Sequence, residues 1–304
     1  MRITAVVVTH SRPDLLGKVI ESLRMQTLPL HRIMIVDNAS DVEICEPFQN
    51  LAGISLIRSE INLGGAGGFV LGLKHAAALG TDWAWLLDDD AIPRIDALEA
   101  LLNCLPQLPE NAGALCGTVI EHGDIALMHR RRFEWKLGME TCVAREEYRD
   151  KAVPLDIGSF VGFLVSASAL ARAGLPDPDF FLAYDDTEFS LRMRAAGLSL
   201  WLVPSSVVDH MRCADARLRS SEFGRKHYFN VRNRIVVKKT YAQYSHLSAW
   251  SAILLGIGIW LRCPGRFRRK TLSILMKAIS DGYAGRLGPY PDTFKAAVPV
   301  NGTS

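Results

Sequence analysis

The run WAWLLDDD at Trp83–Asp90 limits what this chain can fold into more than any other stretch of its sequence. Five apolar or small residues followed at once by three carboxylates are typical of a buried strand and its carboxyl end. In an open α/β sheet, ligands bind at that end of the strands. Adjacent acids repel one another, so we expect a divalent cation, Mg²⁺ or Mn²⁺, to hold them, with phosphate oxygens completing its coordination. The alternative is a solvated acidic turn that caps a helix beginning near Ile95.

Strands and helices alternate through the first 60 residues. Strands are predicted at Ile3–Thr9, Arg32–Asp37 and Ile54–Arg58, and Pro13 opens an amphipathic helix after the first of them. This order is that of a βαβ unit. The acid at the tip of the second strand, Asp37, either accepts a hydrogen bond from a ribose hydroxyl or a base N–H, or caps a helix.

A glycine-rich segment, NLGGAGGF at Asn62–Phe69, precedes a helix predicted at Val70–Leu79. Four glycines in five positions leave almost no side-chain bulk between the backbone and a ligand at a helix N-terminus, which suits a phosphate or a sugar nucleotide. The segment matches neither the P-loop nor the GxGxxG fingerprint. The alternative is a loop that is merely tight.

The middle of the chain is predicted to extend the sheet. A helix is expected at Ile95–Leu105, a strand at Ala112–Val119 and a returning strand at Val153–Ser166. Between the two strands, Glu121–Asp150 is polar and has no clear period, and we interpret it as an excursion or lid. Its basic run Arg130–Arg132 is expected to lie on a solvated face.

Two polar features follow in the second half. Asp185 and Asp186 stand where a helical pattern begins near Thr187. Asp185 is either an N-cap or part of a site; because two adjacent acids exceed what a cap needs, one of them is free to act as a general base on a hydroxyl. Strands are predicted at Leu198–Val203 and at Val207–His210. His210 is either a packed surface histidine or, if the fold returns it to the aspartate triplet, a donor to Mn²⁺.

The carboxyl-terminal third is basic. From residue 211 to 304 there are 17 Lys and Arg against 4 Asp and Glu, which favours an anionic partner. Arg225–Lys239 is predicted as a basic helix. The 12 largely apolar residues of Trp250–Leu261 are too few to span a bilayer, and a basic cluster follows them, as in an interfacial membrane element. The alternative is a core helix with a solvated basic sequel.

Other features of the sequence favour a cytoplasmic protein. The six cysteines are widely spaced without a CxxC pair, so we expect reduced thiols and neither a disulfide framework nor a zinc site. No secretory signal is expected, because Ile3–Thr9 is already predicted as a buried strand. Disorder is expected only at the tail, Pro299–Ser304.

Six motifs in order, VVVTHSRP, IVDNAS, NLGGAGGF, WLLDDDA, GLPDPDFFLAYDDTEFSLR and VVDH, cover the chain from Ile3 to His210. This series resembles the family 2 glycosyltransferases, in particular their galactofuranosyltransferase and rhamnosyltransferase branch. The resemblance implies the GT-A fold, an α/β fold with a mixed, mostly parallel sheet flanked by helices. We expect a catalytic domain at residues 1–212 and a basic helical, membrane-associating extension at residues 213–304.

The resemblance also implies roles for individual residues. Asp186 would be the catalytic base of an inverting transfer. The metal ligands would be Asp88, Asp90 and His210, for Mn²⁺ or Mg²⁺. Contacts to the nucleotide-sugar donor would come from Thr9, Arg12, Asp37, Asn38, Asn62, Gly64, Gly65, Asp88 and Asp89. Contacts to the acceptor would come from Gly162, Tyr184 and Asp185, although that group tends to have Trp in place of Tyr184.

The expected reaction is transfer of galactofuranose from UDP-galactofuranose to a lipid-linked or polysaccharide acceptor. We expect it on the cytoplasmic, inner face of an anionic cell membrane, without a nucleic-acid partner. The alternative within the class is rhamnose transfer from dTDP-rhamnose. More remote alternatives are a nucleotidyltransferase and an inactive membrane scaffold. Because the catalytic strand starts at residue 3, without a further β domain before it, a single-addition enzyme is expected over a polymerase.

Overall fold

A computed structural model describes residues 1–40, 46–48, 51–211 and 221–294. Within these residues the main sheet has ten strands, in the order β10-β13-β6-β12-β4-β1-β2-β3, with β5 paired to β13 and β7 to β6. Its strands are β1 Ile3–Thr9, β2 Arg32–Asn38, β3 Ile54–Ser59, β4 Trp83–Asp88, β5 Ala91–Pro93, β6 Ala112–Glu121, β7 Asp124–Ile125, β10 Val153–Leu155, β12 Phe163–Ser166 and β13 Ser199–His210. A smaller sheet joins β11 (Ile157–Gly158), β8 (Arg130–Glu134) and β9 (Met139–Cys142).

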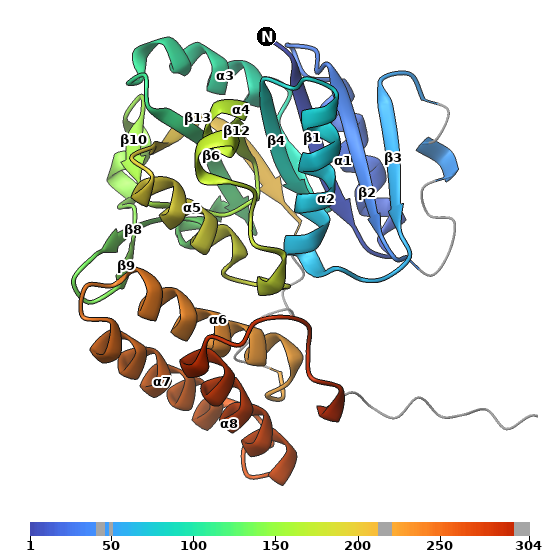
Figure 1. The fold of residues 1–304 in the computed structure, drawn as a ribbon. Helices are drawn as coiled ribbons and strands as arrows, with labels where there is room; N and C mark the ends of the chain where they lie inside the picture. Colours follow the sequence, from blue (N-terminus) through green and yellow to red (C-terminus); the bar gives the residue numbers. More distant parts are fainter. Residues whose placement is uncertain (41–45, 49–50, 212–220, 295–304) are drawn as a thin grey trace, which may run out of the picture.

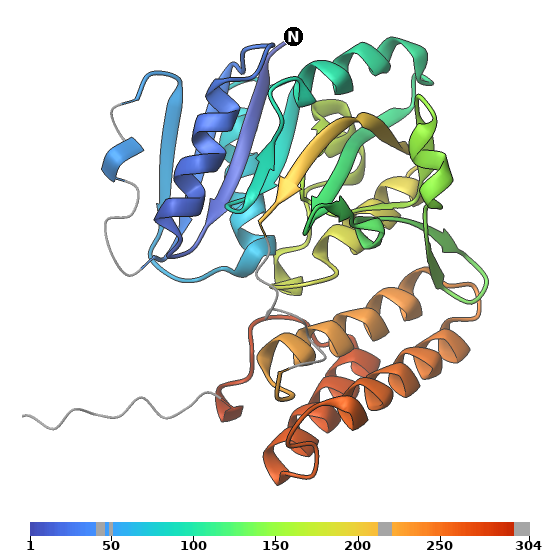
Figure 2. The ribbon, with the colours of Figure 1, turned by 180° about the vertical axis from the view of Figure 1, so that it is seen from behind.

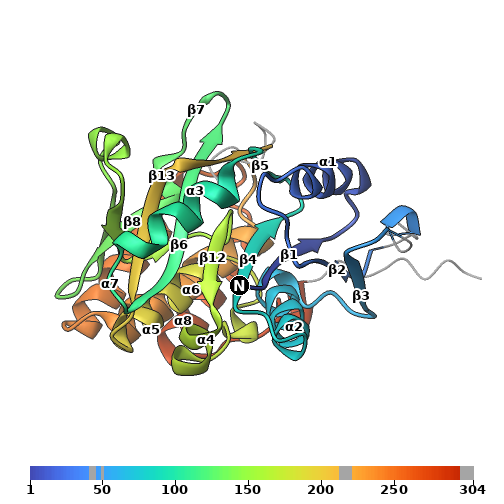
Figure 3. The same ribbon diagram turned by 90° about the horizontal axis from the view of Figure 1, so that it is seen from above.

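The main sheet is mixed, and helices cover both of its faces. β1, β2, β3 and β4 are parallel, β12 runs antiparallel between β4 and β6, and β13 is parallel to β6. The helices are α1 Pro13–Arg24, α2 Gly64–Ala78, α3 Ala97–Cys104, α4 Ala167–Ala173, α5 Asp185–Ala195, α6 Arg225–Tyr241, α7 Ser245–Arg262 and α8 Arg269–Ala284. Figure 3 shows α1 and α3 on one face and α2, α4 and α5 on the other, and Figure 2 shows α1 from its own side.

Alternating side chains of the strands supply the two core layers. Val7 of β1 and Leu87 of β4 pack with α1 and α3, whereas Val6 and Val8 pack with α2 on the opposite face. Because successive side chains of a strand point to opposite faces, a strand buried on both faces is apolar throughout. The apolar runs of the sequence therefore predicted the central strands correctly.

The carboxyl-terminal helices α6, α7 and α8 form a separate packed group. They lie on the side of the sheet to which the carboxyl ends of β1 and β2 point (Figure 1). Their core includes Phe229 of α6, Ile253 of α7 and Ile274 of α8, together with Phe181 from the segment before α5. The basic helix predicted at Arg225–Lys239 is thus confirmed as α6.

The structure corrects three boundaries. α2 begins at Gly64 and not at Val70, so the glycine-rich segment lies within its first turns. A Cβ on Gly68 would come 2.6 Å from Cγ1 of Val8, so glycine lets this helix pack closely on β1. The returning strand predicted at 153–166 is three short strands in two sheets, and the two strands predicted between 198 and 210 are the single strand β13 with an irregularity between Val203 and Val207.

The polar segment 121–150 is folded, and its basic run is not solvated as expected. Arg130 is completely buried and donates to the carbonyl oxygens of Gly117 at 2.8 Å and Val161 at 2.7 Å. A guanidinium has five donors and must find acceptors when buried, and here backbone carbonyls supply them. Arg131 pairs with Glu140 within the smaller sheet, whereas the bond from Arg130 to Gly117 of β6 ties the smaller sheet to the main one.

The expectations on cysteines and on disorder can be compared with the structure only in part. Cys104, Cys116 and Cys142 are free thiols, as predicted. Cys45 and Cys213 lie outside the described residues, as does the tail Pro299–Ser304, for which disorder was predicted.

Gly64 is expected to tolerate no side chain. Its φ is +72°, and a Cβ there would lie 2.0 Å from the carbonyl oxygen of Phe181. Left-handed strain and a clash with backbone together should lower the free energy of unfolding of Gly64→Ala by about 3 kcal/mol. Urea unfolding of this variant beside Gly65→Ala tests this, because a Cβ on Gly65 would meet nothing within 4 Å. Equal stability of the two variants would contradict the expectation.

Candidate active site

The carboxyl ends of β1 and β4 bring the first polar groups together. The two strands are parallel, with Val8 of β1 opposite Asp88 of β4, so Thr9 reaches the aspartate triplet. Thr9 Oγ1 donates to Asp89 Oδ2 at 2.9 Å. Arg12 Nη1 donates to Asp89 Oδ1 at 3.1 Å and to Asp90 Oδ2 at 2.8 Å. Asp89 is thereby held by β1 and the turn after it, while Asp90 keeps its Oδ1 atom for another partner.

His210 returns to the triplet from the far end of the chain. β13 pairs with β5, which places His210 opposite Ala91 and its Nε2 atom 3.1 Å from Asp90 Oδ1. Ligand atoms of Asp88, Asp90 and His210 all lie within 4.8 Å of one another. The surface position considered for this histidine in the sequence is therefore ruled out.

The donor set of this cluster fits a divalent cation. Asp90 Oδ1 is buried and makes no hydrogen bond to any described residue, although the imidazole lies close to it. A buried carboxylate oxygen without a donor is costly unless a cation or a water molecule satisfies it. Two carboxylates and one imidazole are a ligand set that suits Mn²⁺, and carboxylates also suit Mg²⁺.

Electrostatics in the cluster also favour a bound cation. Burial, followed by the negative charge of Asp90, raises the pKa of Asp88 to about 7, and the charge of Asp186 adds to this increase. Burial opposes protonation of His210, but the close contact of its Nε2 atom with the carboxylate of Asp90, together with the charge of Asp88, outweighs burial and raises its pKa to about 9. Without a cation, the cluster thus relieves its repulsion by holding protons.

The base predicted at the start of α5 lies near enough to the same cluster to act on it electrostatically. Asp186 Oδ1 accepts from the backbone N–H of Thr187 at 2.6 Å and from its hydroxyl at 3.0 Å. None of the described residues donates to Oδ2, which leaves that oxygen available for a proton. Asp186 is also close enough to Asp88 for its charge to raise the pKa of Asp88.

Asp185 differs from its neighbour. It is buried, and burial, followed by the charge of Asp186, raises its pKa well above the usual range of a carboxyl. Burial therefore favours the protonated form of Asp185, and a difference in environment of this kind separates the roles of paired carboxylates in active sites. Asp186 is the better candidate for a base, because Asp185 holds its proton.

Two further residues, Glu121 and His129, belong to the site and were missed by sequence reasoning. Glu121 Oε1 lies 2.8 Å from Nδ1 of His210 and 3.0 Å from Nε2 of His129, whose Nδ1 is 2.7 Å from Ser159 Oγ. An ionised carboxylate only accepts hydrogen bonds, so Nδ1 of His210 carries a proton and Nε2 faces the cation site. Glu121 is the last residue of β6, which is parallel to β13. The reasoning that placed Asp88 at a site, because polar side chains at the carboxyl ends of parallel strands bind ligands, therefore applies to Glu121 as well.

Glu121→Ala should weaken Mn²⁺ binding by about 10- to 100-fold, because the imidazole of His210 loses the partner that orients it. Glu121→Gln should lose less, since its amide oxygen can still accept from Nδ1. Calorimetric titration with Mn²⁺ measures both, and Asp124→Ala serves as the control, because Asp124 is an exposed acid that pairs with Arg145. Wild-type affinity in Glu121→Ala would show that this contact does not support the cation site.

The residues implied in donor binding line the neighbouring strand ends and the start of α2. Asn38 donates to the carbonyl of Gly64 at 2.9 Å and accepts from the N–H of Leu63 at 2.8 Å, and Asn62 accepts from the N–H of Gly64 at 2.9 Å. These two side chains shape the glycine-rich segment. Space beside Gly65 is open, so a ligand can approach the backbone there.

Asp37 lies at the tip of β2, beside the end of β1, and its side chain is almost fully buried. Its Oδ1 accepts from the backbone N–H of Ser40 at 3.0 Å, and Arg58 lies 3.4 Å from Oδ2. This is the turn contact of a capping residue, although residues 41–45, where a helix would start, lie outside the described residues. A contact from Asp37 to the donor remains a prediction.

The residues implied in acceptor binding are placed differently from one another. Gly162 has a φ of +75°, and a Cβ there would lie 2.8 Å from Cγ2 of Val208, so its backbone makes the turn into β12. Tyr184 is buried, and its hydroxyl contacts Glu140 at 3.3 Å and Arg234. The side chain of Tyr184 is thus held within the protein, and its contact with an acceptor remains a prediction.

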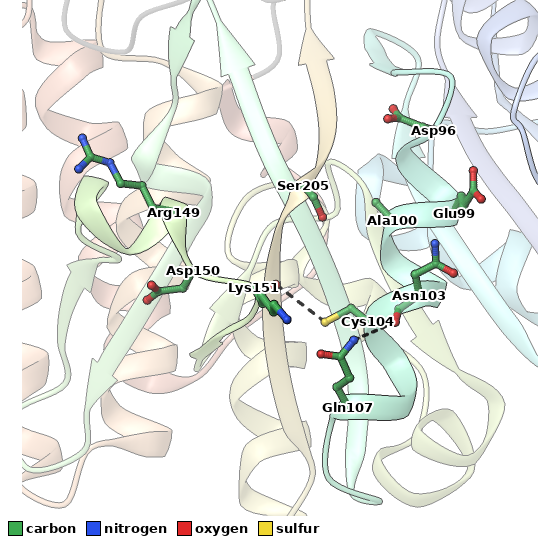
Figure 4. A pocket seen from close by; sticks show the side chains of 10 residues that line it. All are labelled: Asp96, Glu99, Ala100, Asn103, Cys104, Gln107, Arg149, Asp150, Lys151 and Ser205. Atoms are coloured by element: carbon green, nitrogen blue, oxygen red, sulfur yellow. Dashed lines mark hydrogen bonds between the residues drawn. The ribbon is translucent and has the colours of Figure 1, made fainter.

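A cavity of about 490 Å³ lies away from these residues, between α3 and residues 149–151 (Figure 4). None of the acids or histidines of the site lines it. Its lining side chains are those of Asp96, Glu99, Ala100, Asn103, Cys104, Gln107, Arg149, Asp150, Lys151 and Ser205. We assign it no part in the chemistry.

Known proteins resemble this chain in sequence. Residues 4–170 match the family model described as Glycosyl transferase family 2. A protein of Mycobacterium tuberculosis (strain H37Rv) named galactofuranosyltransferase GlfT1 is 35% identical over 249 residues, which cover 76% of this chain and 80% of that protein. A protein of the same name from Mycolicibacterium smegmatis is 30% identical over 246 residues, with 76% and 81% coverage.

Solved structures resemble the chain in fold. GalNAc-T7 with UDP, GalNAc and Mn²⁺ matches with a TM-score of 0.57 at 17% identity, over 84% of this chain and 55% of that chain. TarS residues 1–349 of S. aureus in complex with UDP match with a TM-score of 0.58 at 12% identity, over 94% and 82%. At these identities the likeness concerns the fold alone.

Proposed function

Because the chain belongs to glycosyl transferase family 2, we propose that it transfers galactofuranose from UDP-galactofuranose to a hydroxyl of a lipid-linked or polysaccharide acceptor. It is a glycosyltransferase with the mixed, mostly parallel sheet of the GT-A fold, as the sequence predicted. The observation that carries the proposal is the meeting of Asp88, Asp90 and His210 beside Asp186 at one edge of the sheet. The relatives named galactofuranosyltransferase favour galactofuranose over rhamnose.

In this proposal each residue of the site has its own role in an inverting substitution at the anomeric carbon. Oδ2 of Asp186 takes the proton of the acceptor hydroxyl as its oxygen bonds to the anomeric carbon, and the bond from that carbon to UDP breaks on the opposite face. Arg12 and Thr9 hold Asp89 in place, and the open backbone beside Gly65 receives the donor. A divalent cation bound by Asp88, Asp90 and His210 supplies stabilisation of the diphosphate charge.

Binding and turnover with two nucleotide sugars test the choice of donor. Calorimetric titration with UDP and dTDP in the presence of Mn²⁺ should show tighter binding of UDP. Incubation with UDP-galactofuranose and a panel of lipid-linked acceptors should give a product heavier by one hexose. Tighter binding of dTDP, with product formed only from dTDP-rhamnose, would overturn the choice of donor and leave the family assignment intact.

Membership of the family excludes the nucleotidyltransferase considered from the sequence. That class wants a glycine-rich loop with a lysine after the first strand, whereas β1 is followed by His10-Ser11-Arg12-Pro13. An inactive scaffold would need no base and no cation site. Turnover by the wild type that is lost in Asp186→Asn excludes the scaffold.

We also propose that the helical part, residues 213–304, attaches a catalytic domain of residues 1–212 to the inner face of an anionic membrane. Among the described residues, none of the helices combines the length and apolar character needed to cross a bilayer. The side chains of Trp250 and Leu254 on α7 are 56% and 66% exposed, and Phe267 before α8 is 81% exposed. Arg266 lies over the ring of Phe267, so a cationic and an exposed apolar group are combined between α7 and α8, as in interfacial elements.

Reversing two charges, in the double variant Arg266→Glu with Arg269→Glu, should reduce binding to phosphatidylglycerol vesicles at least tenfold, because each basic residue near an anionic surface contributes about 1 kcal/mol. Co-sedimentation measures the loss. The double variant Lys18→Glu with Arg24→Glu on α1 changes the net charge equally at a distant surface and should bind as the wild type. Equal binding of all three proteins would contradict the membrane proposal.

A further inference from the structure

The segment Phe180–Tyr184, which leads into Asp185 and Asp186, has an unusual backbone. Phe181, Ala183 and Tyr184 have φ values of 63°, 64° and 64°. Residues with a Cβ rarely adopt this left-handed region, and each such residue costs of order 1 kcal/mol or more. A segment with three of them keeps its shape only if its surroundings hold it, and it stands directly before the proposed base.

Asn233 of α6 is the residue that holds the segment. Its Nδ2 atom donates to the carbonyl oxygens of Phe180 at 2.9 Å, Leu182 at 3.0 Å and Ala183 at 2.7 Å. Its side chain is completely buried. The NH₂ group has two hydrogens, so one of them is shared between two of these three carbonyls, and the amide replaces the regular ladder that this irregular segment lacks.

Arg232 fixes the orientation of that amide. Its Nε donates to Asn233 Oδ1 at 2.7 Å, so the NH₂ group must face the segment. Its Nη2 donates to the carbonyl oxygens of Asp179 at 3.2 Å and Phe180 at 3.1 Å. Arg232 is completely buried and lies over the rings of Tyr228 and Phe229. Contacts within α6 therefore hold Arg232 and the amide of Asn233 in the orientation that their bonds to the segment require.

Two further arginines hold the residues that flank Asp185 and Asp186. Arg234 donates to the hydroxyl of Tyr184, and its guanidinium lies 5.3 Å from the centre of that ring. Arg131 Nη2 donates to Thr187 Oγ1 at 2.9 Å, and the same hydroxyl donates to Asp186. The base is thus supported from α6 through the segment before it and from β8 through the residue after it.

We propose that Asn233 is a positioning residue of the transfer reaction, which holds segment 180–184 so that Asp186 faces the cation site. α6 then belongs to the catalytic machinery, and the helical part is more than an attachment to a membrane. The inference rests on the proposed function, because Asp186 must be the base. It also gives a role to part of the basic helix, residues 228–233 (YFNVRN), which lies outside the six motifs of the catalytic part.

Asn233→Leu tests the inference, because leucine has a similar volume but donates no hydrogen bond. Turnover is measured as hydrolysis of UDP-galactofuranose with Mn²⁺, in which water takes the place of the acceptor hydroxyl and UDP is released, so no identified acceptor is needed. We expect kcat to fall by about 10- to 100-fold while UDP binds within twofold of the wild type, as when reacting groups are misplaced. Hydrogen exchange of the amides at 180–186 should become faster. Asn233→Ser keeps one donor and is smaller, so it should disturb folding less. Its kcat and its exchange rate at 180–186 should lie between those of the wild type and Asn233→Leu.

Tyr228→Phe is the matched control. It removes a buried hydrogen bond from the same helix, to Asp281 Oδ2 at 2.6 Å, keeps the ring that lies under Arg232, and leaves the hydrogen bonds of Arg232 and Asn233 to the segment in place. It should lose stability and keep wild-type kcat and wild-type exchange at 180–186. If Asn233→Leu and Asn233→Ser match this control in both readouts, the inference is wrong. If instead the wild type binds no UDP, the proposed function fails, and the exchange measurement still shows whether Asn233 holds the segment.

Discussion

Asp186→Asn should lower kcat by about 10³-fold, within the range expected for removal of a general base, and leave the binding of UDP and Mn²⁺ unchanged. The amide oxygen can still accept from the N–H and hydroxyl of Thr187, so the fold of α5 is preserved. The NH₂ group that replaces Oδ2 cannot take a proton from the acceptor. Rates of UDP release, calorimetry with UDP and thermal unfolding together separate a lost base from a lost fold.

Asp185→Asn is the companion variant. Because burial raises the pKa of Asp185 well above its usual range, this residue holds a proton in the folded protein, and an amide changes its charge little. We expect a loss of kcat of no more than about tenfold and no loss of stability. If Asp185→Asn lost most of its kcat while Asp186→Asn stayed active, Asp185 and not Asp186 would be the base.

Asp88→Asn should affect function and stability in opposite directions. It removes a charged ligand, so we expect Mn²⁺ affinity to fall at least 100-fold and turnover to be lost. In metal-free protein it removes a carboxylate that is buried beside Asp90, and the free energy of unfolding should rise by roughly 1 to 3 kcal/mol. Calorimetry with Mn²⁺ and urea unfolding in EDTA measure the two effects.

The stability that Asp88→Asn gains in EDTA should depend on pH, because the pKa of Asp88 is raised in the folded wild type. The folded protein binds this proton more tightly than the unfolded chain, so wild-type stability falls as pH rises from about 4 to about 7. The advantage of Asp88→Asn in EDTA should therefore be small at pH 4 and full at pH 8. An equal difference at both values, or a less stable variant at pH 8, would contradict the repulsion inferred for this cluster.

Much of the site could be predicted because it depends on strand ends. Apolar runs predicted the central strands, and the ends of parallel strands meet at one edge, so Thr9, Asp37 and the aspartate triplet had to lie near one another. The position of His210 could not be predicted from strand ends alone, because it depends on β13 continuing past an irregularity to pair with β5. The resemblance to a family supplied that step.

Residues whose roles depend on distant hydrogen bonds could not be found from local patterns. Arg130 stands in a basic run that predicts a solvated face, yet it is buried and donates to carbonyls of β6 and of the turn before β12. Asn233 contacts residues about 50 positions earlier, which no period or spacing reveals. The start of α2 was missed because glycines weaken a helix by propensity, and here close packing on β1 outweighs that cost.

Anomalous diffraction from crystals grown with Mn²⁺ and UDP tests the central claim most directly. We predict one strong manganese peak bounded by carboxylate oxygens of Asp88 and Asp90 and by Nε2 of His210, in contact with the diphosphate and facing Asp186. Manganese bound instead between Glu121 and His129, or UDP bound away from this edge of the sheet, would contradict the account.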